Sequence, residues 1–234
     1  MIPLRDDQPI FSTPFVNYFL IVLNVLIFLW EFSVGLQSHR ALNSFLFQFG
    51  VVPHHTLAVL TGHSYDGLAT AIVPIFTSMF LHASFLHVGV NMLFLWIFGD
   101  NIEDYLGHFT YLVFYLASGV AAGVTHILLN QSSRVPSIGA SGAIAGVMGA
   151  YFILYPKARV LVWFPPIFLF HVPAWLMLGY WFVVNFWSGT TMAIAETGQT
   201  SGIAFWAHIG GFVAGILMIN LFRERPHRYR YGTW

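Results

Sequence analysis

Four polar side chains fall inside apolar stretches of this sequence. Ser141 lies in the run GASGAIAG, His208 lies in FWAHIGGF, and His87 and Asn91 share the run FLHVGVNML. Polar residues within membrane-spanning helices are costly and are candidates for function. A serine hydroxyl becomes a good nucleophile only when an adjacent base accepts its proton. Ser141 and His208 are therefore a candidate nucleophile and general base.

The same stretches supply hydrogen-bond donors for an oxyanion. His87 and Asn91 are four residues apart, so on a helix they share one face, about 6 Å apart. The backbone N–H of Ser141 is a third donor, because N–H groups in the first turn of a helix have no intrahelical partner. Acyl transfer requires such donors to be fixed before reaction. No carboxylate lies in the inner part of another span to orient His208, so we expect a Ser–His dyad.

Each of these residues also has a simpler interpretation. A serine among glycines is often a packing residue of a membrane helix. His208 can be a buried imidazole with satisfied hydrogen bonds, and His87 and Asn91 can form an interhelical hydrogen bond. The chain contains eleven histidines, so some reach a similar depth by accident. We interpret His126 and His171 as structural or interfacial.

A metal site is a further alternative. His82, His87 and His208 are potential zinc ligands, since imidazole commonly binds zinc. However, no intramembrane carboxylate, cysteine or HExxH motif completes the set. We therefore expect neither a metal nor a cofactor, and a histidine-lined metal or proton transporter is the weaker hypothesis.

Bringing these groups together requires helices that start at one face of a membrane. Serine is a favoured N-cap residue, and the serines expected to cap the second, fourth and sixth spans are Ser84, Ser137 and Ser201. Counted from these caps, the four polar residues lie three to seven residues into their helices, roughly 5 to 10 Å below the surface. Small residues also recur at four-residue spacing, in pairs that let two helices approach closely: Gly142 with Gly146, and Gly211 with Gly215.

The composition places the chain in a membrane. Of its 234 residues, 57% are hydrophobic and 8% are charged, whereas soluble domains carry about 25% charged residues. The absence of cysteine excludes disulfides and thiol chemistry. Nine basic and nine acidic residues cancel, so the charge gives no reason to expect a nucleic-acid partner. The expected partners are membrane lipids and transmembrane proteins, and the oligomeric state stays open.

The apolar runs predict an all-α, polytopic membrane protein with six transmembrane helices in a single domain, residues 1–234. A spanning helix needs about 20 mostly apolar residues. Residues 33–83 are too polar to span, so we expect a long loop with short, half-immersed helices. The predicted spans are residues 15–32, 85–106, 109–130, 138–155, 170–188 and 202–222.

The basic residues predict the orientation. With six spans and a cytoplasmic N-terminus, seven lysines and arginines lie inside and two, Arg40 and Arg134, lie outside. This bias agrees with the positive-inside rule. We expect both termini in the cytoplasm and the polar groups near the outer face.

Three motifs resemble the signature blocks of the rhomboid intramembrane serine proteases. They are HASFLHVGVNMLFLWIFGDNIE, GASGAIAG and AHIGGFVAG, which are similar to H-x4-H-x3-N, G-x-S-G and A-H-x-x-G-x3-G on the second, fourth and sixth helices. The resemblance extends over essentially the whole chain, in the basic six-helix form with a membrane-embedded first loop.

The resemblance implies a serine endopeptidase that cleaves transmembrane segments near the outer face of a membrane, by regulated proteolysis in a bacterial inner (plasma) membrane. Ser141 is then the nucleophile and His208 the base, and His87, Asn91 and the Ser141 N–H hold the oxyanion. Supporting residues are His82, Gly139, Gly142, Gly211 and Gly215. A catalytically silent rhomboid-like binder of membrane proteins is the alternative.

The chain departs from the family pattern in two places. The Trp-Arg pair of the family's first loop is absent, and Ala145 stands where relatives carry an aromatic residue against the histidine. We therefore expect Phe205 or Trp206 to hold His208. Gly99 and Glu103 match a G-x3-E pattern that we interpret as structural.

Overall fold

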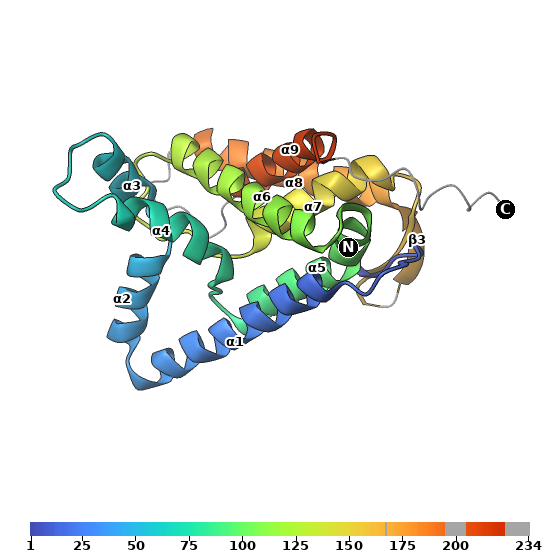
Figure 1. The fold of residues 1–234 in the computed structure, drawn as a ribbon, viewed down its shortest axis with the longest axis horizontal. Helices are drawn as coiled ribbons and strands as arrows, with labels where there is room; N and C mark the ends of the chain where they lie inside the picture. The colour runs from blue at the N-terminus through green and yellow to red at the C-terminus, as the bar shows by residue number, and fades with distance from the viewer. Residues whose placement is uncertain (167, 195–204, 223–234) are drawn as a thin grey trace.

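The structure, a computed structural model, describes residues 1–166, 168–194 and 205–222. These residues form helices and one small sheet (Figure 1). The helices, in chain order, are α1 Phe15–Gln37, α2 His39–Phe49, α3 Pro53–Leu60, α4 Ala69–Thr77, the 3-10 helix η1 Ser78–Phe80, α5 Phe85–Leu106, α6 His108–Leu129, α7 Ser141–Leu154, α8 Ala174–Ile194 and α9 Phe205–Ile219. The strands are β1 Ile2–Arg5, β2 Arg159–Phe164 and β3 Phe168–Pro173.

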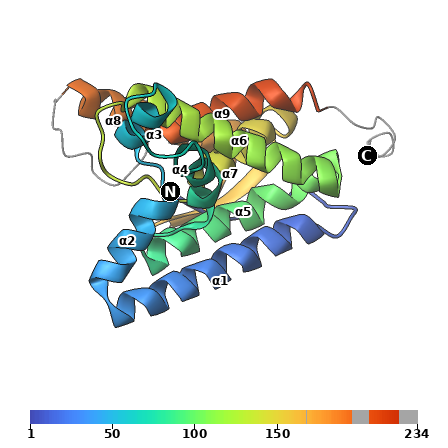
Figure 2. The same ribbon diagram turned by 60° about the vertical axis from the view of Figure 1, so that its left-hand side comes forward.

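Helix α7 forms the centre of the bundle. It packs against α5, α6 and α9, and α8 packs on the outside of α9 (Figures 1 and 2). Every residue from Gly142 to Tyr151 is buried, as expected for a helix that is apolar on all sides and surrounded by other helices. The helix that carries Ser141 is therefore also the most enclosed one in the described part of the chain.

Helices α1, α5 and α6 are long and apolar enough to cross a membrane, judged by length and composition. Helices α7 and α9 are equally apolar but shorter, with 14 and 15 described residues. Helix α1 runs beside α5 in both views (Figures 1 and 2). It extends five residues beyond the predicted end at 32, to Gln37.

The segment between α1 and α5 contains the short helices α2, α3, α4 and η1, as the sequence predicts. Ser38 caps α2, since its side chain accepts a hydrogen bond from the Ala41 N–H. The pair Val51 and Ser137 exchanges two backbone hydrogen bonds, of 3.0 and 2.8 Å. This segment is therefore tied to the chain that leads into α7.

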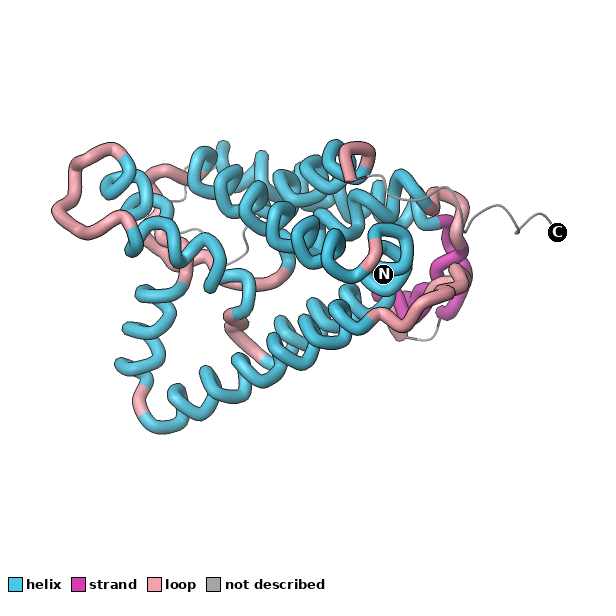
Figure 3. Tube along the Cα trace, in the orientation of Figure 1, coloured by secondary structure: helices cyan, strands magenta, loops and turns pink. Residues whose placement is uncertain are grey.

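A three-stranded antiparallel sheet in the order β1-β2-β3 lies at one end of the helices (Figure 3). Strands β2 and β3 form a hairpin between α7 and α8, and β1 pairs with β2. The sequence prediction did not include these strands, and α8 begins at Ala174 rather than near residue 170. The reason is that runs such as VLVWF and FLFHV are short, apolar and β-branched or aromatic, which periodicity alone does not distinguish from helix.

Candidate active site

Ser141 is the first residue of α7, directly after a sharp turn. Gly139 has a φ of +128°, a conformation that side chains rarely adopt, and its N–H donates to the Ser78 carbonyl at 2.8 Å. A Cβ atom at residue 139 would lie 2.9 Å from two atoms of the His87 ring. Only glycine fits this turn, which directs the Ser141 side chain toward α5 and α9.

His208 of α9 lies within hydrogen-bond distance of this serine. The Oγ atom of Ser141 and the Nε2 atom of His208 are 2.7 Å apart. Glycines make this approach possible, because a Cβ at Gly211 would lie 2.0 Å from the Gly142 carbonyl oxygen and one at Gly215 would lie 2.0 Å from that of Gly146. The predicted small-residue faces thus meet, and the two helices touch backbone to backbone.

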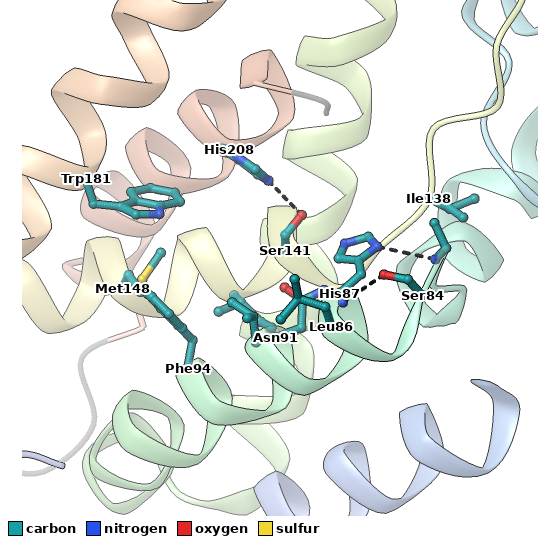
Figure 4. A pocket seen from close by; sticks show the side chains of 13 residues that line it. Ser84, Leu86, His87, Asn91, Phe94, Ile138, Ser141, Met148, Trp181 and His208 are labelled. Carbon is teal, nitrogen blue, oxygen red and sulfur yellow. Dashed lines mark hydrogen bonds between the residues drawn. The ribbon is translucent and has the colours of Figure 1, made fainter. Parts of the chain in front are cut away.

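A cavity of about 430 Å³ opens beside the pair. Figure 4 shows Ser141 between His208 and the α5 side chains of His87 and Asn91. The rest of the wall is largely apolar, and its large side chains include Leu86, Phe94, Ile138, Ile144, Met148 and Trp181. A mostly apolar cavity with a few convergent polar groups is typical of a ligand-binding or catalytic site.

Three hydrogen-bond donors border this cavity. Asn91 is only 6% exposed, and its Nδ2 has no hydrogen-bond partner among the described residues. Leaving such a donor unpaired costs about 1 to 3 kcal/mol. The His87 Nδ1 accepts a long, 3.4 Å hydrogen bond from the Ala83 N–H, which leaves Nε2 to carry the proton of a neutral ring. The Ser141 N–H lies at the start of α7, before the first i→i−4 hydrogen bond, and therefore has no partner within the helix.

His82 lies behind these donors rather than among them. Its ring is buried and packs against His87 with a centroid distance of 5.0 Å. Its backbone N–H donates to the Glu31 carboxylate at 3.0 Å, which ties the segment before α5 to α1. This position agrees with a supporting residue that holds the His87 ring in place.

The comparison with known proteins gives the family. A model of the Rhomboid domain matches residues 69–225. This chain belongs to the rhomboid family. It is 32% identical over 152 residues to Rhomboid protein 1, mitochondrial, of Saccharomyces cerevisiae, covering 63% of this chain and 41% of that protein.

Two further relatives are equally distant. The chain is 31% identical over 156 residues to the human Presenilin-associated rhomboid-like protein, mitochondrial, covering 64% of this chain and 38% of that one. It is 30% identical over 158 residues to RHOMBOID-like protein 1 of Arabidopsis thaliana, covering 68% and 36%. The matches span only about two fifths of the relatives' length.

Family and fold together identify this rhomboid as an integral, multi-pass membrane protein with a helical, polytopic fold, as predicted from the sequence. The exact number of spans stays a prediction. Within the described residues, no three His, Asp or Glu side chains gather in a way that could hold a metal ion.

One of the predicted helix caps of this rhomboid is confirmed and one is wrong. Ser84 caps α5, because its Oγ accepts a hydrogen bond from the His87 N–H at 3.1 Å. Ser137 does not cap α7, since it pairs with Val51 in extended backbone and the helix begins only at Ser141. The positive φ of Gly139 separates the two. Ser201, the third predicted cap, lies outside the described residues.

The residues that hold His208 in this rhomboid were not foreseen. We expected Phe205 or Trp206, but the contacts come from α8. The Trp181 ring packs on the imidazole with a centroid distance of 5.6 Å, and the Asn185 Oδ1 lies 2.6 Å from the His208 Nδ1. A signal was present, because Asn185 is a single amide within the apolar run WFVVNFW and polar residues in spans are candidates for function.

Proposed function

We propose that this rhomboid is an intramembrane serine endopeptidase. The Ser141 Oγ attacks the scissile carbonyl carbon while the His208 Nε2 takes the hydroxyl proton, forming a C–O bond and a tetrahedral oxyanion. The 2.7 Å separation of these two atoms is the observation that carries the proposal, because proton transfer needs the base within hydrogen-bond reach.

The oxyanion is held by donors already at the cavity wall. We assign this role to the Asn91 Nδ2, the His87 Nε2 and the Ser141 backbone N–H. The unpaired Nδ2 of Asn91 supports the assignment, since preorganised donors are worth most where charge develops. Collapse breaks the C–N bond, and the imidazolium of His208 gives its proton to the leaving amine. Water then hydrolyses the acyl-enzyme by the same route, and no cofactor takes part.

The proposed substrates are transmembrane segments of other proteins, which reach the site from the lipid. The family and the largely apolar cavity wall support this class. Because the matches span only about two fifths of the relatives' length, the substrate class is our proposal for this chain. The alternative, a catalytically silent binder, would bind the substrate without cleaving it, and its Ser141 would not be labelled.

The test compares two serines. In one assay the purified protein is treated with a fluorophosphonate, which labels activated serines. In the other, the protein is incubated in liposomes with a helical membrane substrate. We expect Ser141→Ala to abolish both labelling and cleavage. Ser132→Ala, in an exposed loop, should retain both. Equal cleavage by wild type and Ser141→Ala would refute the protease.

We further propose that residues 1–234 form one domain with both termini in the cytoplasm and the site near the outer face. The bonds between Val51 and Ser137 support a single unit. The sequence-based expectation is a bacterial plasma membrane, whereas two of the relatives are named as mitochondrial. The identity of the membrane therefore remains a prediction.

The orientation can be tested with single cysteines, because the chain has none. Gln131 lies in the loop that precedes α7, Lys157 lies just after the end of α7, and both are exposed. In intact cells, an impermeant maleimide should label Gln131→Cys directly and Lys157→Cys only after permeabilisation. The reverse pattern would overturn the orientation and leave the proposed chemistry untouched.

A further inference from the structure

Asn185 of α8 lies on the side of the His208 ring opposite Ser141. Its side chain is buried, at 7% exposure, within the apolar run WFVVNFW. Its Oδ1 is 2.6 Å from the His208 Nδ1, and its Nδ2 donates to the Trp181 carbonyl at 2.8 Å, one turn earlier in the same helix. Both ends of the amide are therefore engaged.

These two contacts fix the direction of the amide. A carbonyl oxygen only accepts hydrogen bonds, so the group that faces the Trp181 carbonyl must be the NH₂ group. The amide oxygen then faces the imidazole, and it too only accepts. The Nδ1 of His208 must therefore carry a hydrogen.

The protonation of Nδ1 determines what the His208 ring presents to Ser141. A neutral imidazole carries one ring proton, so a protonated Nδ1 leaves the lone pair on Nε2. That is the atom 2.7 Å from the Ser141 Oγ. The hydrogen-bond chain from the Trp181 carbonyl through Asn185 and His208 thus presents a proton acceptor, rather than a donor, to the serine.

We propose that Asn185 is a positioning residue, which fixes the tautomer and the ring direction of His208. This inference rests on the proposed protease function and adds a third member to the Ser141–His208 pair. The amide keeps its role throughout the reaction, because Nδ1–H still donates to Oδ1 after Nε2 has taken the serine proton. A third group that orients the base in this way is a recurrent feature of nucleophilic catalysis.

An amide is better suited than a carboxylate to orient His208 inside a membrane span. An ionised carboxylate inside a membrane span is costly to desolvate, whereas a neutral amide with both ends hydrogen-bonded is not. Trp181, one turn before Asn185, covers the face of the same ring. Helix α8 therefore holds the base by its edge and by its face.

The test uses two substitutions of Asn185 and a matched control. Asn185→Leu keeps the approximate volume and removes the acceptor, whereas Asn185→Asp keeps an acceptor at the same place. The control is Asn24→Leu, because Asn24 is also buried and its Nδ2 also donates to the carbonyl four residues earlier, at 2.7 Å. Asn24 lies on α1, away from His208.

The first readout is the rate at which a fluorophosphonate labels Ser141 in detergent. We expect Asn185→Leu to slow labelling by about 10- to 100-fold, part of the usual contribution of a general base. Asn185→Asp should be labelled faster than Asn185→Leu and within about tenfold of wild type, and Asn24→Leu within about twofold. The thermal midpoint of each variant shows whether it is folded.

The second readout separates positioning from a merely structural role. In protein labelled with ¹⁵N-histidine, the His208 signals, assigned by their loss in His208→Gln, should show a protonated Nδ1 and an unprotonated Nε2. Asn185→Leu should lose this single tautomer while the other histidine signals persist. The inference is overturned if Asn185→Leu keeps the wild-type tautomer and labelling rate, or if a folded Asn185→Asp is as slow as Asn185→Leu.

These outcomes differ from a failure of the protease proposal. If wild-type Ser141 is never labelled and never cleaves, the proposed function fails. If wild type is labelled and Asn185→Leu is labelled equally fast, the function stands and only the role of Asn185 is wrong.

Discussion

Helices α7 and α9 pack backbone against backbone, whereas α1 contacts its neighbours through side chains, and three of its five buried residues are polar. Between α7 and α9, a Cβ at Gly149, Gly211 or Gly215 would lie 2.0 to 2.2 Å from a carbonyl oxygen of the facing helix. Small residues of this kind allow close helix contact in membranes. No side chain at these points can adjust, so this interface sets the distance between Ser141 and His208.

The α1 interface uses three buried polar residues spaced seven apart, Asn17, Asn24 and Glu31. This spacing places them on one face of the helix. Asn17 donates to the Leu95 carbonyl at 3.0 Å and accepts from the Tyr111 hydroxyl at 2.8 Å. Side chains of this length can adapt to small shifts. We therefore expect α1 to contribute to stability and α7–α9 to contribute to both stability and catalytic geometry.

The largest expected effect comes from Gly215→Ala. The new Cβ would lie 2.0 Å from the Gly146 oxygen and within 2.7 Å of two further backbone atoms of that residue, so the helices must separate. We expect a loss of about 3 kcal/mol or more in unfolding free energy, at the upper end for overpacking. Fluorophosphonate labelling of Ser141 should fall by about 100-fold or more, because the general-base contribution is lost.

The matched control is Gly123→Ala in α6. There the nearest atom to a new Cβ is the Ile75 Cγ2 at 3.6 Å, an ordinary contact, and alanine favours helix by about 1 kcal/mol. Labelling and stability should stay at the wild-type level or improve slightly. Equal damage by both substitutions would break the contrast, since it would mean that any added methyl group disturbs the bundle.

A second test addresses the α1 side through Glu103, a fully buried residue of α5. Its carboxylate accepts from the backbone N–H groups of Val16 and Asn17, at 2.9 and 2.6 Å, and so caps the start of α1. Glu103→Ala leaves these donors unpaired and should cost about 1 to 3 kcal/mol. Denaturant titration in detergent measures this loss.

Glu103→Ala should differ from Gly215→Ala in the activity of the protein that remains folded. Below its unfolding transition, Glu103→Ala should label within about threefold of wild type, since the general base stays in place. Glu103→Gln, which keeps the size and one acceptor oxygen, should recover much of the stability. A folded Glu103→Ala protein without labelling would show that α1 also controls the catalytic geometry.

The sequence contains more information about the α7–α9 interface than about its surroundings. Polar residues in apolar runs and glycines at four-residue spacing are local patterns, and they predict Ser141, His208 and the helices that bring them together. The stripe on α1 is equally regular, with Asn17, Asn24 and Glu31 seven apart. None of its members suggests chemistry alone, so this pattern does not by itself predict the α1 interface.

Other features depend on contacts or angles that a sequence does not contain. The start of α7 depends on the φ of Gly139, and so the cap was misassigned to Ser137. Strand β2 pairs with β3 and also with β1, a partner more than 150 residues earlier in the chain. Asn185 lies outside the sequence prediction, because that prediction takes only a carboxylate as the group that orients His208.

The smallest expected effect concerns Asp6, in the segment between β1 and α1, where contacts are again polar. Its carboxylate accepts a hydrogen bond from the Tyr151 hydroxyl. Burial raises the pKa of Asp6 from 3.8 to about 6. The native state therefore binds more protons than the unfolded state between about pH 4 and 6, so this group makes the protein less stable as the pH rises through that window.

Asp6→Asn removes the titration and keeps an acceptor for Tyr151. The full pKa shift corresponds to about 3 kcal/mol, but Asp6 is only partly buried, and solvent screening reduces the expected gain to about 1 kcal/mol at pH 7. Unfolding free energies should agree with wild type near pH 4 and diverge toward pH 7. Labelling of Ser141 should not change between the two proteins, because the contact of Asp6 is made by side chains, which can adjust to small shifts. A gain that is independent of pH would mean that the substitution acts through packing and not through the buried charge.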